Sequence, residues 1–152
     1  MKAIRNSAKA IIIKNGCLLT VKNIDSEGVW YLLPGGGQNL GETLIEALRR
    51  ECIEEIGIDV SVCRLRYVRE YIGKNHEFSF RDSDSHQVEF MFECEFDEQR
   101  PPNLGINPDV YQVDIAWLPI NKIHEFRIYP KLLGDLLLSE VDNDNIYLGD
   151  VS

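Results

Sequence analysis

The amino-acid sequence predicts an α/β fold, a sandwich in which a mixed β-sheet surrounds one central helix and a second helix follows near the C-terminus. Short apolar or alternating runs, which are typical of strands, lie on both sides of one long amphipathic segment at residues 41–56. Hydrophobic residues make up 44% and charged residues 27% of the chain, as in ordinary soluble domains. A length of 152 residues favours one domain, which we expect over residues 1–140, followed by an acidic, partly solvated tail over 141–152.

The first half of the chain contains the strands that lead to the helix. Residues 8–13 and 17–21 flank an Asn-Gly pair, which favours a hairpin turn, so we expect two antiparallel strands there. A loop at 26–28 precedes a short strand at 29–33, which Pro34 and the glycines at 35–37 should stop. The central helix then runs to about Ile56, and Gly57 suits a left-handed C-cap.

The second half alternates predicted strands with polar loops. Residues 60–71 are β-rich, and residues 73–85 form a polar loop. Apolar and acidic residues alternate over 86–96, which predicts a half-buried strand whose glutamates face solvent. After a loop at 98–108 we expect a strand at 110–118 and a final helix at 130–139, with leucines on one face and Pro130 near its start.

Charge and composition argue against several classes of function. The chain has 16 basic and 25 acidic residues, a net charge of −9, which disfavours non-specific binding to nucleic acid. No apolar run is long enough for a membrane span or a signal peptide, so we expect no membrane partner and a cytoplasmic location. The four cysteines form no CxxC pair and are expected to be small buried residues of a reduced protein.

Acidic residues on the central helix break local rules. On a wheel of about 100° per residue, one face is apolar, and it comprises Leu44, Ile45, Leu48, Cys52, Ile53 and Ile56. Glu51, Glu54 and Glu55 form an acidic strip that reaches into this face. Their mutual repulsion costs roughly 0.2–0.5 kcal/mol per pair, and the negative end of the helix dipole adds about 0.3–1 kcal/mol per charge. A divalent cation such as Mg²⁺ or Mn²⁺ would remove both costs; ordinary surface glutamates are the alternative.

Three consecutive glycines precede this helix. Gly35, Gly36 and Gly37 would let the backbone approach a ligand closely beside the acidic strip, although a tight turn would use the same residues. The two features together favour a metal-assisted phosphate site.

Residues 36–58 as a whole resemble the Nudix box, the signature of the MutT-like hydrolases. The box positions are filled, at the required spacing, by Gly36, Glu42, Arg50, Glu51, Cys52, Glu54, Glu55, Gly57 and Ile58. Cys52 is small for its apolar position and is the one mild departure. The resemblance implies a Nudix-type α/β/α sandwich with a mixed sheet, a central box helix and a C-terminal helix. It also implies hydrolysis of a nucleoside diphosphate linked to another group.

The resemblance assigns roles to individual residues of the box. Glu51, Glu54 and Glu55, with the carbonyl of Gly35, would bind the metal ions, Mg²⁺ or Mn²⁺, and Arg50 would orient these glutamates. Arg50 also suits an i,i+4 pair with Glu46, and Glu42 suits an organising role at the helix start better than a ligand role.

The general base is left open at this point. Glu51 and Glu54 are the candidates within the box, where a carboxylate would accept a proton from the attacking water. Asp109 is a possible additional acid outside it, although an aspartate after Pro108 also suits a turn. Glu89 and Glu93 are further alternatives.

The substrate is the least determined part of the prediction. Trp30 and Tyr31 could stack on a base, Arg69 could contact phosphate or ribose, and Gly36 and Gly37 could approach the ligand. Residues 68–95 resemble family members acting on ADP-ribose, so ADP-ribose or another nucleoside diphosphate sugar is favoured. Nucleoside triphosphates are the alternative, followed by dinucleoside polyphosphates or capped RNA. A non-catalytic nucleotide sensor and a diphosphate isomerase are the other functional classes, and relatives suggest a possible homodimer.

Overall fold

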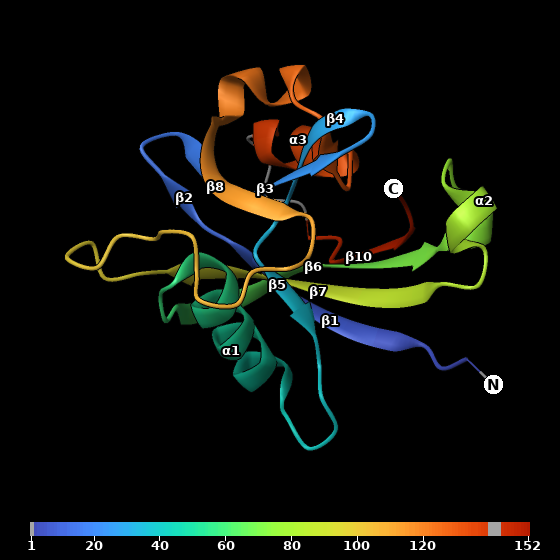
Figure 1. Ribbon diagram of the computed structural model, residues 1–152, viewed down its shortest axis with the longest axis horizontal. Coiled ribbons are helices and arrows are strands. Elements are labelled where there is room, and N and C mark those ends of the chain that lie inside the picture. Colours follow the sequence, from blue (N-terminus) through green and yellow to red (C-terminus); the bar gives the residue numbers. More distant parts are fainter. Residues whose placement is uncertain (1, 140–143) are drawn as a thin grey trace.

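One long helix and two mixed sheets organise the computed structural model, which describes residues 2–139 and 144–152 (Figure 1). In chain order the elements are β1 (Arg5–Ile11), β2 (Ile13–Lys14), β3 (Cys17–Asp25), β4 (Gly28–Leu32), β5 (Gly35–Gly37), α1 (Leu44–Ile56), β6 (Ser61–Ile72), the 3₁₀ turn η1 (Gly73–Asn75), α2 (Ser79–Asp82), β7 (His86–Glu95), β8 (Gln112–Pro119), the 3₁₀ segment η2 (Ile120–Glu125), β9 (Ile128–Tyr129), α3 (Leu132–Leu138) and β10 (Tyr147–Asp150).

The strands divide between two sheets rather than forming the single mixed sheet that we expected. The first has the order β10-β6-β7-β1-β5, and the second has the order β2-β3-β4-β9 with β8 paired to β3. Parallel pairing joins β1 to β7, β6 to β10 and β4 to β9, while the other pairs are antiparallel. In Figure 1, α1 lies on one side of the strands and α3 on the other. The predicted α/β/α sandwich of the Nudix type is confirmed.

Helix α1 ends as the sequence predicts but begins at Leu44, three residues after the predicted start at residue 41. Thr43 is the N-cap and forms a reciprocal capping box with Glu46, and Gly57 closes the helix with a φ of 70°. The predicted apolar face is only partly correct. Leu48, Cys52 and Ile56 are buried, but the exposed fractions of Ile45 and Ile53 are 47% and 43%. Ile45 lies in the first turn of α1, and Ile53 lies at the edge of the apolar arc.

The chain changes sheets where a single hairpin was expected. Asn15 and Gly16 have φ values of 51° and 72°, and this turn pairs Ile13–Lys14 with Cys17–Leu18. Residues 8–11, however, belong to β1 in the other sheet. The glycines at 35–37 do not only stop β4, as predicted: they form β5 against β1. At Gly35 a Cβ would lie 2.1 Å from the carbonyl oxygen of Ala8, so only glycine permits this approach.

Strand β7 is covered on both faces over much of its length, which corrects the expectation that Glu89 faces solvent, whereas Glu95 is exposed as expected. Phe92 and Cys94 pack in the cluster that includes α1, and Met91 packs in a second cluster with residues of β3, β8 and α3. Glu89 faces the same side as Met91 and is 8% exposed. Alternation alone could not reveal this second layer, because a chain-distant sheet supplies it.

The last described residues add a strand that the sequence analysis did not predict. Within the expected acidic tail, Tyr147–Asp150 form β10, parallel to β6 at the edge of the first sheet. The side chain of Arg69 donates a hydrogen bond to the carbonyl of Val151 over 2.7 Å. Residues 140–143, where the tail was expected to start, lie outside the described residues.

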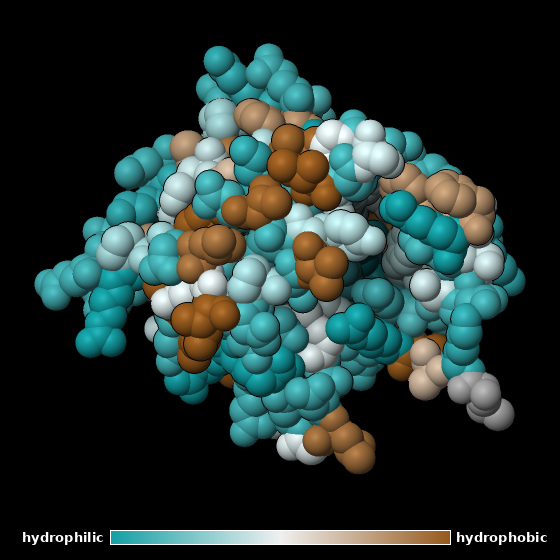
Figure 2. Space-filling view, in the orientation of Figure 1, coloured by the Kyte–Doolittle hydropathy of each residue, from teal (hydrophilic) through white to brown (hydrophobic). Residues whose placement is uncertain are grey.

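The surface and the cysteines match an ordinary globular protein. The face in Figure 2 is mostly hydrophilic, with apolar side chains in small groups separated by polar ones. Cys52 and Cys94 are buried as expected, but Cys63 is exposed and Cys17 half-buried; none forms a disulfide. No described helix is long and apolar enough to cross a membrane.

Replacing Leu48 by alanine should test which face of α1 is buried. Leu48 is fully buried, so the cavity left by Leu48→Ala should lower the free energy of unfolding by about 2–5 kcal/mol. Ile45→Ala, on the same helix but half-exposed, is the matched control and should cost well under half as much. Urea unfolding monitored by circular dichroism measures both values. Equal losses would contradict the burial described above.

Candidate active site

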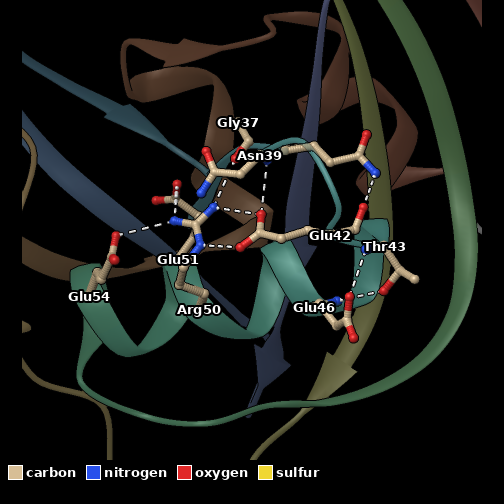
Figure 3. Close-up of polar contacts among 9 residues, drawn as sticks. Gly37, Asn39, Glu42, Thr43, Glu46, Arg50, Glu51 and Glu54 are labelled. Carbon is tan, nitrogen blue, oxygen red and sulfur yellow. Dashed lines mark hydrogen bonds and ion pairs between the residues drawn. The ribbon is translucent and has the colours of Figure 1, made fainter.

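Arg50 contacts several parts of the box that are separated along the sequence. Its guanidinium donates hydrogen bonds to both oxygens of Glu42 over 2.7 and 3.1 Å and to Glu51 over 2.9 Å. It also donates to the carbonyl of Gly37 over 3.0 Å and lies 3.5 Å from Glu54 (Figure 3). Arg50 therefore joins the start of α1, the glycine strand and the acidic strip.

The start of α1 is organised by Glu42, as predicted. Its carboxylate also accepts a hydrogen bond from the backbone N–H of Asn39 over 2.9 Å. The hydrogen bond from Arg50, more than that from Asn39, lowers the pKa of Glu42 to about 2. The predicted i,i+4 pair of Arg50 with Glu46 is replaced by these contacts, because the Glu46 carboxylate accepts a hydrogen bond from the Thr43 N–H in the capping box (Figure 3).

The glycine strand and the acidic strip are in direct contact. At Gly36 a Cβ would lie 2.6 Å from the carboxylate carbon of Glu51, so a side chain here would displace that carboxylate. The N–H of Gly35 donates to Glu55 over 3.3 Å, and Lys9 donates to the Gly35 carbonyl over 3.0 Å. The backbone of β5 and the carboxylates of α1 thus form one surface.

Glu55 is the buried member of the strip, with an exposed fraction of 2%. Burial raises its pKa to about 8, because the charged carboxylate loses its hydration, and Asp109 and Glu51 raise the pKa further. Lys9 and the Gly35 N–H oppose this shift.

The C-terminal end of α1 is capped by backbone donors. The N–H groups of Asn103, Gly105 and Asn107 donate to the carbonyls of Ile56, Glu55 and Glu54 over 2.9–3.0 Å. The Gln112 side chain donates to the Glu55 carbonyl as well, over 2.8 Å. These donors satisfy the carbonyls that the last turn of a helix leaves open, although no basic side chain lies in that turn.

A cavity of about 300 Å³ opens beside the glycine strand, at the lower end of the usual size of ligand pockets. Five cationic side chains line it, namely Arg5, Lys9, Arg69, Arg81 and Arg127. The acidic lining comprises Asp25, Asp82, Glu89 and Asp109, and the aromatic lining comprises Trp30, Tyr71, Phe78 and Tyr129. Cations next to aromatic rings suit a nucleotide, which combines anionic phosphates with a flat base.

Only some of the predicted substrate-binding residues line the cavity. Trp30, Gly36 and Arg69 line the cavity, and so does the predicted additional acid Asp109. Tyr31 points away from it, packs edge-on to Phe126 at 5.8 Å and belongs to the second core cluster. Neighbouring residues of a strand face opposite sides, so the prediction of Tyr31 as a base-stacking residue finds no support in this cavity.

Gly37 also lies outside the cavity lining, and a Cβ there would lie 2.3 Å from the Arg5 guanidinium. Arg69 is held by Glu89 over 2.5 Å, and both residues are less than 10% exposed. Although burial opposes it, the charges of Arg69, Lys9 and Arg5 keep the pKa of Glu89 below its ordinary value. Glu93 lies elsewhere and pairs with Arg64 and Arg66.

Sequence reasoning missed several cavity residues. Arg5, Lys9 and Arg127 were not predicted, and neither were Asp25 and Tyr129. One signal was available: Arg5, Ser7 and Lys9 are two positions apart along β1, which places them on one face, and alanines follow Ser7 and Lys9. Arg127 offered no such pattern, because its bidentate pair with Asp25 joins residues 102 positions apart.

The sequence model of the NUDIX domain family matches residues 4–134, most of the chain. This protein belongs to the Nudix family. It is therefore a Nudix hydrolase, an enzyme that acts on the pyrophosphate bonds of nucleotides. Nudix enzymes act on small nucleotide substrates and generally need a divalent metal ion.

Relatives and solved structures agree with this Nudix assignment. The protein is 31% identical over 124 residues to nucleoside triphosphatase NudI of Salmonella heidelberg, covering 78% of this chain and 82% of the relative. It is 34% identical over 98 residues to the RNA pyrophosphohydrolase of Helicobacter pylori, covering 59% and 63%. The MutT Nudix hydrolase of Burkholderia pseudomallei superposes with a TM-score of 0.70 at 20% identity, covering 91% of this chain and 100% of that one. An ADP-ribose pyrophosphatase of Streptococcus suis has a TM-score of 0.62 at 17% identity, covering 97% and 100%.

The donor chemistry of the Nudix box fits a divalent ion. Glu51, Glu54 and Glu55 present carboxylate oxygens from one helix, and the missing Cβ of Gly36 leaves room for the Glu51 carboxylate on the glycine strand. Over residues 2–139 and 144–152, however, no three acidic, histidine or cysteine side chains are gathered closely enough to hold a metal. Arg50 contacts both Glu51 and Glu54 in this arrangement, so the metal-ligand assignments stay predictions.

The burial of Glu55 makes the stability of the metal-free protein depend on pH. The pKa of Glu55 is about 8 in the folded protein against an ordinary value of 4.5, so the folded state binds this proton more tightly than the unfolded state. The contribution of Glu55 to the free energy of unfolding is therefore full below pH 4.5 and falls as the pH rises towards 8. Glu55→Gln, which has no proton to lose, should be more stable than the parent protein by roughly 2–5 kcal/mol at pH 8 and nearly equal at pH 4.5. Urea unfolding in EDTA measures this difference, and a pH-independent difference would contradict it.

Proposed function

We propose that this protein is a divalent-metal-dependent pyrophosphohydrolase that cleaves the P–O–P bridge of a nucleoside diphosphate linked to another group. The observation that carries the proposal is the contact between the Glu51 carboxylate and Gly36 at the edge of a cavity lined by cationic and aromatic side chains. Carboxylates for a metal and a polar backbone for phosphate therefore lie beside a chamber that suits the rest of a nucleotide.

The metal would be held by Glu51, Glu54 and Glu55, together with the carbonyl of Gly35. When bound, Mg²⁺ or Mn²⁺ supplies charge neutralisation of the phosphate oxygens and a lower pKa of the attacking water. Lys9 and Arg5 are placed beside the glycine strand, where they can bind the same phosphates. Arg50 fixes the orientation of Glu51 and Glu54, either of which can accept the proton of the water.

The two substrate classes have different support. The relative from Salmonella heidelberg, 82% of which is covered by the match, is named a nucleoside triphosphatase, and this name favours nucleoside triphosphates. The match to a structure named ADP-ribose pyrophosphatase, at 17% identity, supports only the fold. Nucleoside triphosphates therefore come first among the candidate substrates, and ADP-ribose or another nucleoside diphosphate sugar, favoured on sequence alone, comes second.

A Glu54→Gln variant should separate an enzyme from a nucleotide sensor. Removing a carboxylate of the acidic strip should lower kcat by about 10²–10⁴, while circular dichroism and melting temperature stay close to those of the parent protein. Glu46→Gln on the same helix is the matched control, since glutamine can replace glutamate in a capping box. EDTA should stop the reaction of the parent protein. Undiminished turnover by Glu54→Gln, or turnover in excess chelator, would contradict the proposal.

A substrate panel tests the order of the candidates. With Mg²⁺ or Mn²⁺ present, we expect kcat/KM for at least one nucleoside triphosphate to exceed that for ADP-ribose by about tenfold or more. The products are identified by mass, and a reaction in ¹⁸O-water shows which phosphorus the water attacks. A preference for ADP-ribose would reverse the order and leave the proposed reaction type intact.

A further inference from the structure

One wall of the cavity comes from the connection between β6 and β7, residues 73–85. This connection contains η1 and α2 and contributes Phe78, Arg81 and Asp82 to the lining. Figure 1 shows α2 at the end of the β6–β7 hairpin, far along the sheet from α1. The position of this wall must therefore be fixed by contacts other than those of the box helix.

Asp150 on β10 supplies such contacts. Its carboxylate accepts hydrogen bonds from the Ile72 N–H over 2.9 Å and from the Asn75 side chain over 2.8 Å. The ring of His76 lies 2.6 Å from the same carboxylate. One side chain thus contacts the last residue of β6 and two residues of the connection, and all three lie more than 70 positions away in the sequence.

These contacts lead directly to the cavity. The His76 ring stacks on Tyr71, with centroids 5.0 Å apart and planes 13° apart. Tyr71 lines the cavity, and its hydroxyl donates to Asp82 on α2 over 3.3 Å. The guanidinium of Arg69, another lining residue, lies 5.7 Å from the Tyr71 ring. A chain of contacts therefore leads from Asp150 through His76 and Tyr71 to α2.

Asp150 is negatively charged at neutral pH. Although burial opposes it, the hydrogen bonds from Asn75, His76 and the Ile72 N–H lower its pKa to about 2. Hydrogen bonds to an ionised acceptor are about twice as strong as neutral ones, so this group can hold a connection that contains only one short helix.

We propose that Asp150 is a positioning residue for nucleotide binding, which acts through His76 and Tyr71 to hold Phe78 and Arg81 in the cavity wall. The inference rests on the proposed function and adds to it a residue outside the Nudix box. The rings of Tyr71 and Phe78 suit a flat base, and Arg81, which lies 4.5 Å from the Phe78 ring, suits the charged part of the same ligand. Asp150 itself need not touch the nucleotide.

The test compares Asp150→Ala and Asp150→Asn with Asp144→Asn, an exposed aspartate of the same region. Steady-state kinetics give KM and kcat for the best substrate of the panel. Tryptophan fluorescence gives the dissociation constants of AMP and UMP, and limited proteolysis gives the rate of trypsin cleavage after Lys74 and Arg81. Trp30 lines the cavity and can report binding. The monophosphate titrations need no turnover.

Asp150→Ala should raise KM and the dissociation constant of the better-binding monophosphate by about tenfold, the equivalent of about 1.4 kcal/mol. It should leave kcat within about threefold, and cleavage after Lys74 and Arg81 should accelerate more than cleavage elsewhere. Asp150→Asn should have a smaller effect than Asp150→Ala, because its amide oxygen keeps part of the hydrogen bonding, although it cannot accept all three hydrogen bonds. Asp144→Asn should have none. If Asp150→Ala does not fold, Asp150→Asn decides the matter by the same measurements.

Unchanged KM and dissociation constants would overturn the inference, and so would a uniform rise in proteolysis with a parallel loss of kcat, which indicates a general structural role. A parent protein that binds AMP or UMP but hydrolyses no nucleotide would overturn the proposed function, and the dissociation constants would still decide the role of Asp150. A parent protein that neither binds nor hydrolyses nucleotides would overturn both.

Discussion

The contacts of Arg50 are the constraint on which the box depends. One guanidinium donates hydrogen bonds to Glu42 at the helix start, to Glu51 on the acidic strip and to the Gly37 carbonyl. A glycine strand has little of its own to fix it, because it has no side chains to pack. Pairing with β1 holds β5 in its sheet, and Arg50, together with the hydrogen bond from the Gly35 N–H to Glu55, connects β5 to α1. Lysine could not replace Arg50, because only a planar guanidinium can contact several acceptors in one plane.

The acidic strip is stabilised more fully by the protein than its sequence suggested. The carbonyls at the end of α1 accept N–H groups from residues 103–107, which offsets the unfavourable end of the helix dipole. Arg50 offsets part of the charge of Glu51 and Glu54, although it also pairs with Glu42, and the charge of Glu55 is removed when it binds a proton. The protein itself therefore lowers both electrostatic costs in part. Membership of a family that generally needs a metal ion carries the case for one.

Local sequence rules predicted the longer elements but not their neighbours. The C-cap at Gly57 and the turn at Asn15-Gly16 were readable because each depends on a few adjacent residues, whereas the capping box of Thr43 with Glu46 was not predicted. The pairing of β1 with β7 and the burial of Glu89 depend on residues about 80 positions apart, which periodicity does not encode. For the same reason β10 was missed: it is a strand of four residues in a segment rich in acidic residues, and its position comes from pairing with β6.

The same difference between local and long-range features explains why the type of reaction was easier to predict than the substrate. The groups that would perform hydrolysis lie within residues 35–55, so a single motif identifies them. The groups that line the rest of the cavity come from β4, β6, the 73–85 connection and β9, and they meet only in the folded chain. Tyr31 illustrates the consequence, since it is next to Trp30 in sequence and faces the opposite side of the strand. A motif can therefore fix the chemistry of this protein, whereas its choice of nucleotide depends on contacts between distant segments.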